Sequence, residues 1–379
     1  MCEFGADGRV YYPTEDSSWS APGPAALGFD PGRLAEAVDF ARVHETVWPH
    51  DLRAHLEKGA FEEGPSNAIL GPTKDRGAPS GVILRGGRIA TEWGDTFRAD
   101  MTFSVAKSYL SIVAGLAFDR NLIMDLDEPV VVHGRSLADD AGYDPPRNRF
   151  ITWRHLLQQT SEWEGTLWGK PDMIDRHRHI MGRKGTQPKG SFRALAEPGK
   201  FWEYNDVRIN RLALALLQLW RKPVAAVFRD HFMDVIGAGA EWRWHGYHNS
   251  TVTIDGQPME SVSGGGHWGG GVFINARDQA RVGLAMLRGG MWRNRRLLSQ
   301  AWIERSLEPC PLNAVYGLLW WLNTDRQLYA EASKESYFAF GAGYNITWID
   351  PAHDLVVVLR WIRDVDVGRF IGLTMKALA

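Results

Sequence analysis

Apolar residues recur at helical spacing in several stretches of the chain. The segment GRLAEAVDFARVHET follows Asp30 and Pro31, and this pair predicts a helix start with Asp at the N-cap and Pro at the first helical position. The run SYLSIVAGLAFDRN, which begins at residue 108, has the same spacing. Further helices are predicted for ITWRHLLQQT, DVRINRLALALLQLWRK and NARDQARVGLAMLRGG.

Strand patterns lie toward the two ends of the chain. GVILRGGRIATEWGD alternates around Gly86 and Gly87, a pair that accepts positive φ, and so predicts two antiparallel strands. The runs GVFI, YGLLWWLN, YNITWID and DLVVVLRWI predict more strands. Between about 121 and 264 the pattern is helical. We therefore expect an α/β domain of residues 1–120 and 265–379, interrupted by a mostly helical domain of residues 121–264.

Composition narrows the class of protein. The 379 residues are 44 % hydrophobic, enough for a large core, and the net charge of −2 gives no field that would attract nucleic acid or an anionic membrane. The two basic stretches, DRHRHIMGRK and WRNRR, are interpreted as solvated loops. The first thirty residues lack a signal-peptide pattern, no apolar run reaches about 20 residues, and there are two cysteines, Cys2 and Cys310. We expect a soluble cytoplasmic protein.

Ser104 and Lys107 in MTFSVAKSYL are the first candidates for chemistry. Residues three apart are neighbours on a helix surface, so these two side chains can touch. Serine needs an adjacent base to become a nucleophile, and a helix N-terminus stabilises an oxyanion with its free N–H groups. By itself the pair is a weak signal, because an ordinary helix start also explains it.

Two other patterns have simpler explanations. The cluster GGGHWGGG contains the glycine spacing of a dinucleotide site, but it does not open onto a helix after a clear strand. Asp175, His177 and His179 could be drawn as a metal cluster, but alternate residues between arginines are more often solvated. We therefore expect neither a nucleotide site nor a metal.

The order of five motifs resembles that of the serine β-lactamase-like hydrolases. The motifs are TFSVAKS, ITWRHLLQQTS, EPGKFWEYND, GGGVFINARDQARVGLAMLRGG and FGAGYNITWIDPAHDLVVV. The family includes class C β-lactamases, D-Ala-D-Ala peptidases, family VIII esterases and 6-aminohexanoate-dimer hydrolases, and the resemblance runs from about Asp30 to the C-terminus. It implies an α+β fold of the β-lactamase/transpeptidase type, with an antiparallel sheet flanked by helices and an inserted helical domain.

The resemblance also implies roles for individual residues. Ser104 matches the acylated serine, Lys107 the motif lysine and Tyr204 the tyrosine of the Tyr-x-Asn element. The backbone N–H groups of Ser104 and Ala342, or of Gly343 in place of Ala342, would form an oxyanion hole. For the wall of the substrate pocket we expect Trp163, Asp206, His267, Trp268, Gly343, Tyr344 and Asn345; for the tryptophans, core packing is the alternative.

Two positions depart from the family pattern. Asp206 stands in Tyr204-Asn205-Asp206 where an amide or hydroxyl is usual. A carboxylate beside Lys107 would favour the ammonium form, so either Asp206 points away as a helix cap or Tyr204 carries most of the base role. The second departure is Phe340-Gly341-Ala342-Gly343, which has no cation where β-lactamases have Lys-Thr-Gly.

The sequence thus predicts a serine hydrolase that cleaves a small ester or amide through an acyl-enzyme on Ser104. The missing cation favours neutral substrates over β-lactams by at least about 10²-fold, unless an arginine from another part of the chain supplies the charge. Two alternatives remain: an acyltransferase with the same acyl-enzyme, and a sensor that is acylated without turnover. We expect a small-molecule substrate, no cofactor, no nucleic acid and no membrane, and the sequence leaves a homodimer open.

Overall fold

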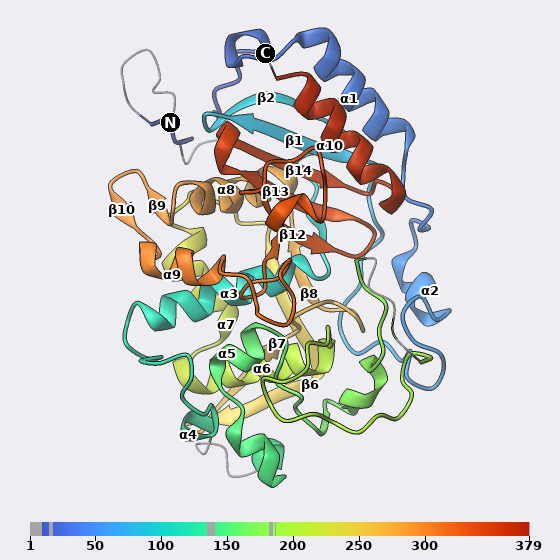
Figure 1. The fold of residues 1–379 in the computed structure, drawn as a ribbon, viewed down its shortest axis with the longest axis vertical. Coiled ribbons are helices and arrows are strands. Elements are labelled where there is room, and N and C mark those ends of the chain that lie inside the picture. Colours follow the sequence, from blue (N-terminus) through green and yellow to red (C-terminus); the bar gives the residue numbers. More distant parts are fainter. Residues whose placement is uncertain (1–9, 15–17, 135–140, 182–184, 186, 379) are drawn as a thin grey trace.

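The computed structural model describes residues 10–14, 18–134, 141–181, 185 and 187–378. Its central element is a six-stranded antiparallel sheet with the order β11-β12-β13-β14-β1-β2, drawn in cyan and red in Figure 1 because segments from both halves of the chain contribute to it. The strands are β1 (Ser80–Arg85), β2 (Arg88–Trp93), β11 (Trp321–Leu322), β12 (Tyr337–Gly341), β13 (Asn345–Asp350) and β14 (Leu355–Arg360).

The β1-β2 hairpin follows the predicted pattern. Gly86 and Gly87 form its turn with φ values of 60° and 78°, a conformation that glycine adopts without steric cost. Strand β1 then pairs on its other side with β14, in a register that places Ser80 opposite Arg360. The N-terminal hairpin is thereby joined to the C-terminal hairpin in one sheet.

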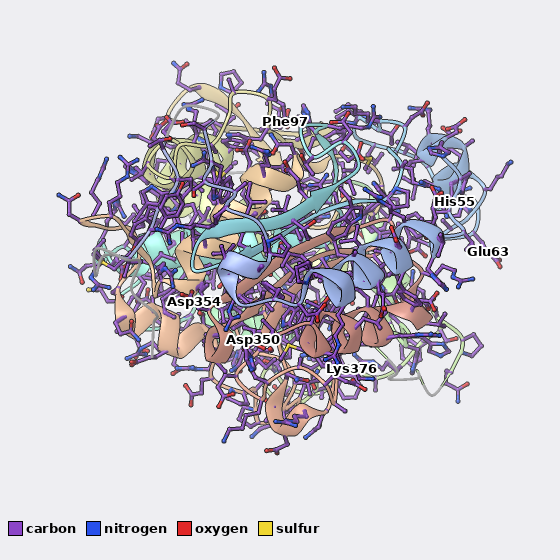
Figure 2. All side chains as sticks on the ribbon, turned by 90° about the horizontal axis from the view of Figure 1, so that it is seen from above. His55, Glu63, Phe97, Asp350, Asp354 and Lys376 are labelled. Carbon is purple, nitrogen blue, oxygen red and sulfur yellow. The ribbon has the colours of Figure 1, made fainter. Side chains whose placement is uncertain are left out.

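Helices cover the sheet (Figure 1). Helices α1 (Pro31–Val43) and α10 (Val367–Lys376) lie side by side at one end of the molecule, and the Asp30 carboxylate caps α1 as predicted. Helix α8 (Ala276–Leu287) packs on β13 and β14, where Gly283 allows close approach to Val356 and Thr347. Figure 2 looks onto α1 and α10 and shows Lys376 on the outer surface.

A second, four-stranded sheet has the order β3-β8-β6-β7. Its long hairpin, β6 and β7, lies inside the interval 121–264 that the sequence predicted as mostly helical, so this interval also contains strands. The strands are β3 (Asp100–Met101), β6 (Arg243–Ile254), β7 (Gln257–Val262) and β8 (Gly271–Ile274). The helices of the interval are α4 (Val131–Gly134), α5 (Trp153–Leu157), α6 (Asp206–Trp220) and α7 (Val224–Phe228).

Helix α3 (Val105–Phe118) is the buried helix between the two parts of the molecule, since it contacts β12 and β13 as well as α6 and α7. Its apolar residues face partners on all sides, as expected of an almost continuous apolar run. The remaining elements are α2 (Leu52–Glu57), α9 (Gln300–Ser306), β4 (Thr166–Leu167), β5 (Lys170–Pro171), β9 (Met291–Trp292) and β10 (Arg295–Arg296).

Three sequence expectations can be compared with the fold directly. The run YGLLWWLN is not a full strand, since only Trp321–Leu322 pairs in the sheet. Cys310 is buried, and Cys2 lies outside the described residues. Among the described residues, no helix is both long and apolar enough to cross a membrane.

Candidate active site

Ser104 is the residue immediately before helix α3 and faces a pocket of about 370 Å³. The preceding Phe103 has a φ of +50°, which is uncommon for a residue with a side chain and turns the chain sharply from β3 into α3. The Ser104 hydroxyl does not cap the helix. It is therefore free to contact other side chains at the helix N-terminus.

Lys107 lies one turn into α3 and is the partner that helical spacing predicts. Its Nζ donates a hydrogen bond to Ser104 Oγ at 2.8 Å. The same Nζ also donates to Asp206 Oδ1, and both members of this ion pair are only 2 % exposed. The ammonium group therefore joins the candidate nucleophile to a buried carboxylate.

The expectation that Asp206 points away as a helix cap is wrong. Asn205 is the N-cap of α6, because its side-chain oxygen accepts from the Arg208 N–H at 3.1 Å. Asp206 is the next residue and turns its carboxylate toward Lys107. Its second oxygen accepts from Arg178 and from His267 Nδ1, the latter at 2.9 Å.

The charge of Asp206 is determined by these neighbours. Burial by itself would raise the pKa of this carboxyl, but Lys107, Arg178 and His267 together hold its pKa well below the usual range. Asp206 is therefore ionised in the folded protein. It faces the pocket only through the cations that surround it, and it is not among the residues that line the pocket.

Tyr204 lines the same pocket as Ser104 and is largely buried. Lys107 Nζ lies 4.7 Å from the centre of its ring, and the guanidinium carbon of Arg178 lies 5.2 Å from that centre. Trp321 stacks against the ring at 5.8 Å between centroids and fixes its orientation. Two cations are thus close enough to stabilise negative charge that develops on this side chain.

The end of β12 passes close to the backbone of Ser104. A Cβ atom on Gly341 would lie 1.8 Å from the Thr102 carbonyl oxygen and 3.4 Å from the Ser104 nitrogen, so only glycine fits there. Ala342, Gly343 and Tyr344 follow and line the pocket. This segment brings backbone N–H groups to the side of the pocket that contains Ser104.

Asn345 has a different position from the one expected. It is fully buried, and its Nδ2 donates to the Ala342 carbonyl at 3.0 Å. It does not line the pocket. Its amide instead supports the turn that carries Ala342 and Gly343.

The two tryptophans predicted at the pocket wall belong to the core. Trp163 is 1 % exposed and donates from Nε1 to the Gly142 carbonyl, and Trp268 is equally buried and donates to the Ser66 carbonyl. Large rings with a satisfied N–H are stable in the interior, so core packing explains both. The aromatic surface of the pocket comes from Trp48, Phe61, Tyr204, Trp321, Phe340 and Tyr344.

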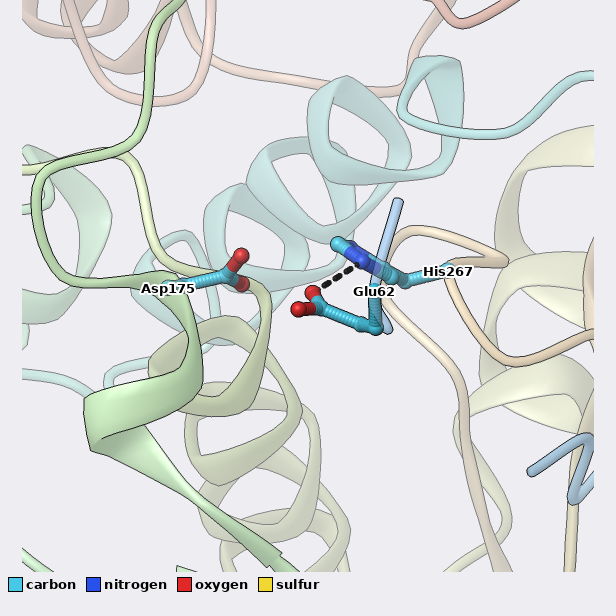
Figure 3. A group of neighbouring side chains, drawn as sticks. All are labelled: Glu62, Asp175 and His267. Carbon is cyan, nitrogen blue, oxygen red and sulfur yellow. Dashed lines mark ion pairs between the residues drawn. The ribbon is translucent and has the colours of Figure 1, made fainter. Parts of the chain in front are cut away.

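His267 also lies behind the pocket, where it takes part in a buried ion-pair network with Glu62 and Asp175 (Figure 3). Its Nδ1 faces Asp206, and its Nε2 lies 2.7 Å from Glu62 Oε1. The candidate ligand atoms of Glu62, Asp175 and His267 lie within 4.8 Å of one another, as a metal site requires. However, the ammonium group of Lys189 contacts Glu62 and also Asp175, at 3.1 Å, and so competes with a metal ion for both carboxylates.

The loop between β5 and α6 contains the residues that sequence reasoning missed. Arg178 and Lys189 line the pocket. Arg178 lies in DRHRHIMGRK, which was interpreted as a solvated loop, and Lys189 follows that stretch. Asp175 is fully buried as well, which contradicts the same interpretation. Neighbouring cations, above all Lys189 and Arg178, outweigh the effect of burial and lower its pKa. Alternating charges in a loop give no periodic signal that would distinguish a pocket wall from a solvated surface.

The departure in Phe340–Gly343 suggested a pocket without cations. The structure shows that the pocket does contain them. The segment itself has none, but Arg178 and Lys189 enter from another part of the chain. The premise that only apolar surface and backbone meet the substrate is wrong. The preference for neutral substrates, which depended on that premise, loses its support.

Comparisons with known proteins identify the family and the fold of the chain. The Beta-lactamase family model matches residues 81–369. The chain is 24 % identical over 313 residues to the 6-aminohexanoate-dimer hydrolase of Paenarthrobacter ureafaciens, which covers 77 % of this chain and 74 % of that enzyme. Trp48, Phe61 and Glu62 precede the matched segment.

Solved structures show the same fold at low identity. A penicillin-binding protein homologue from Caulobacter crescentus superposes with a TM-score of 0.58 at 13 % identity, over 93 % of this chain and 99 % of that chain. A family VIII carboxylesterase superposes with a TM-score of 0.56 at 15 % identity, over 96 % and 99 % of the two chains. Antiparallel sheets with flanking helices are thus common to all three.

Proposed function

The chain belongs to the β-lactamase family, and on that premise we propose that it is a serine hydrolase that cleaves an ester or amide through an acyl-enzyme on Ser104. The observation that carries the proposal is the hydrogen bond of 2.8 Å between Lys107 Nζ and Ser104 Oγ in a pocket that Tyr204 also lines. The arrangement combines a hydroxyl at a helix N-terminus, a cation beside it and a phenol in the same pocket that can act as the base, which nucleophilic catalysis requires.

In the acylation step, Ser104 Oγ attacks the substrate carbonyl carbon. Its proton passes to Tyr204, because the ion pair with Asp206 keeps Lys107 charged and unable to accept it. For this step Tyr204 starts as the phenolate, whose negative charge Lys107 and Arg178 stabilise, and it becomes neutral when it takes the proton. The backbone N–H groups of Ser104 and Ala342 stabilise the oxyanion.

The carbon–oxygen or carbon–nitrogen bond then breaks, and Tyr204 returns the proton to the leaving alcohol or amine. Water attacks the acyl-enzyme in the second half of the reaction. Tyr204 accepts one of its protons and passes a proton back to Ser104 Oγ. The reaction releases an alcohol or amine and then a carboxylic acid, and it regenerates the free enzyme. None of these steps requires a cofactor.

A labelling experiment tests the nucleophile. Purified protein is treated with a fluorophosphonate, the intact mass is measured, and the modified peptide is sequenced by mass spectrometry. We expect one adduct, on Ser104, together with an initial burst of 4-nitrophenol from 4-nitrophenyl acetate. An adduct on another residue, or ester turnover that survives complete labelling of Ser104, would refute the proposal.

The same assay separates hydrolysis from its alternatives. With an added alcohol or amine, a hydrolase releases mainly the free acid, whereas an acyltransferase gives the new ester or amide. A sensor would give a stoichiometric burst and no steady-state turnover. We expect steady-state release of acid.

A further inference from the structure

The pocket that contains Ser104 presents cations to its interior and keeps carboxylates behind them. Arg178 and Lys189 line it, with side chains that are 11 % and 26 % exposed. No Asp or Glu is among the described lining residues. The carboxylates that pair with these cations are Asp206, Asp175 and Glu62, and all three are more deeply buried.

The formal charges in this network balance before a substrate binds. Three carboxylates, Glu62, Asp175 and Asp206, contact three cations, Lys107, Arg178 and Lys189. The network therefore has no excess negative charge that would repel an anionic ligand.

Arg178 retains donors for such a ligand. Its Nη1 donates to Asp206 and lies 3.5 Å from Asp175 Oδ1. A guanidinium has five N–H groups, and within the described part of the chain those on Nε and Nη2 have no hydrogen-bond partner. These atoms form one edge of a fork that matches the two oxygens of a carboxylate.

The guanidinium is also held in place. Its carbon lies 5.2 Å from the ring centre of Tyr204 and 5.9 Å from that of Phe61, so it lies between two aromatic rings. Burial would lower the pKa of Arg178, but Asp175 and Asp206 raise it above the usual value. A fixed, permanently charged donor loses little entropy when an anion binds.

Lys189 has a different role. Its Nζ donates to Glu62 and to the Phe61 carbonyl, and it lies 3.1 Å from Asp175 Oδ1 without a hydrogen bond to that atom. Two of its three N–H groups are therefore used within the protein, and the ammonium group contributes positive charge to the pocket. Arg178 is the better match for a carboxylate, because its planar guanidinium presents two nitrogens to the two oxygens.

We propose that the physiological substrate is an ester or amide that carries a carboxylate, and that Arg178 is the residue that selects it. This inference rests on the proposed hydrolase function. Ser104 and Arg178 line the same pocket, so one substrate can present its scissile carbonyl to Ser104 and its carboxylate to Arg178. An ammonium group in the same position would meet a like charge.

Matched substrates test the proposal with the intact enzyme. Three 4-nitrophenyl esters have six-carbon acyl chains that end in a carboxylate, a methyl or an ammonium group: the adipate monoester, the hexanoate and the 6-aminohexanoate. A second pair places the charge on the leaving group, with 4-carboxyphenyl acetate against 4-carbamoylphenyl acetate. In at least one set we expect kcat/KM to favour the carboxylate by about tenfold or more, since a hydrogen bond to a charged group is worth about 1.5–3 kcal/mol.

The preference has two further signatures. It should shrink as salt is raised from 0.02 to 0.5 M, because ions screen charge attraction in an open pocket. Arg178→Gln should reduce the ratio of carboxylate to neutral kcat/KM to about one, and Arg178→Lys should retain part of it. Lys376→Gln, on the outer surface of α10, is the matched control and should leave the ratio unchanged.

The two proposals fail in distinguishable ways. If no ester of either set is hydrolysed and Ser104 is not labelled, the hydrolase function is wrong. If neutral esters are hydrolysed and the carboxylate is disfavoured or equal in both sets, the hydrolase function stands and the role of Arg178 is wrong. An Arg178→Gln variant that does not fold leaves the wild-type ratio and its salt dependence to decide.

Discussion

Lys107 and Asp206 are 99 residues apart in the sequence, and their side chains form a buried ion pair beside Ser104. A lysine that already donates to a carboxylate is a poor acceptor for the serine proton. In the proposed mechanism the proton transfer therefore falls to Tyr204, and Lys107 supplies charge. Under this proposal, a carboxylate at the position that usually holds an amide or hydroxyl changes which residue acts as the base.

Ser104→Ala should abolish turnover without unfolding the protein. The hydroxyl contributes little to the core, so we expect the free energy of unfolding to change by no more than about 0.5 kcal/mol. Ester hydrolysis and urea denaturation measure the two effects. Ser111→Ala is the matched control, because within the described structure its buried hydroxyl on the same helix has no hydrogen-bond partner. Substantial activity in Ser104→Ala would disprove the assignment.

Tyr204→Phe should lower kcat by on the order of 10² or more and change KM much less, since the lost proton transfer belongs to the transition state. Steady-state kinetics with a neutral aryl ester measure both constants. Tyr109→Phe also removes a phenolic hydroxyl, one that is buried without a partner in the described structure, and should keep kcat. An equal loss in both variants would point to packing in place of catalysis.

Asp206→Asn should move the pH–rate profile to lower pH. Removal of a carboxylate from a cluster of cations makes the site release its proton more easily, so the ionisation that activates the enzyme occurs at lower pH. The profile of kcat/KM between pH 5 and 9 measures the shift. Asp278→Asn, at the start of α8, removes another buried carboxylate and should leave the profile in place. A profile identical to the wild type would show that Asp206 does not act on the catalytic ionisation.

The Asp206 carboxylate should also make the free energy of unfolding depend on pH. The pKa of Asp206 is lowered in the folded protein, so its contribution is complete above the pKa of the unfolded chain, near 4, and is lost as the pH falls through the folded value. At pH 7 we expect Asp206→Asn to cost about 3 kcal/mol, because two buried cations lose a partner. Denaturation series at pH 7 and pH 3 should show a smaller difference between wild type and variant in acid. A constant difference would contradict the ionised state of Asp206.

Gly265→Ala should disturb the ion pair between Lys107 and Asp206 and so lower activity. A Cβ atom there would lie 2.0 Å from Asp206 Oδ1 and 2.6 Å from Lys107 Nζ, so the ion pair has to shift. A displacement of about 1 Å near the reacting groups can cost on the order of 10² in rate. Gly368→Ala, in α10, meets only ordinary contacts and should keep full activity. Equal kcat values for the two variants would show that the ion pair tolerates the shift.

Sequence patterns predicted the parts of the fold that depend on neighbours in the chain. Gly86 and Gly87 specify their hairpin turn, and Asp30 with Pro31 specifies the start of α1. Ser104 and Lys107 share a helix, so their contact follows from spacing. Asp255 and Gly256, which form the β6-β7 turn, carry a recognisable hairpin signal, and attention to it would have revealed the strands within the interval 121–264.

Local sequence patterns could not predict the contacts between segments that are distant in the chain. The direction of the Asp206 side chain depends on Arg178 and His267, which come from two different loops. Arg178 itself lies in a charged loop that looks solvated in the sequence. Trp163 and Trp268 are large aromatic residues that could line a pocket or pack in the core. They are buried in the core, and this outcome depends on tertiary packing that the sequence pattern does not show.

The pairing of β1 with β14 has a consequence for synthesis of the protein. Ser80 lies opposite Arg360, so β1 is left without this neighbour until residue 360 has been translated. Strand β12, whose Gly341 contacts the backbone beside Ser104, joins the same sheet through β13 and β14. Because sheet contacts of such long sequence separation form late, a nascent chain that already contains Ser104, Lys107 and Asp206 should lack catalytic activity until the C-terminal strands have been translated. The hydrolytic site would then appear only when the C-terminal hairpin docks onto the N-terminal one.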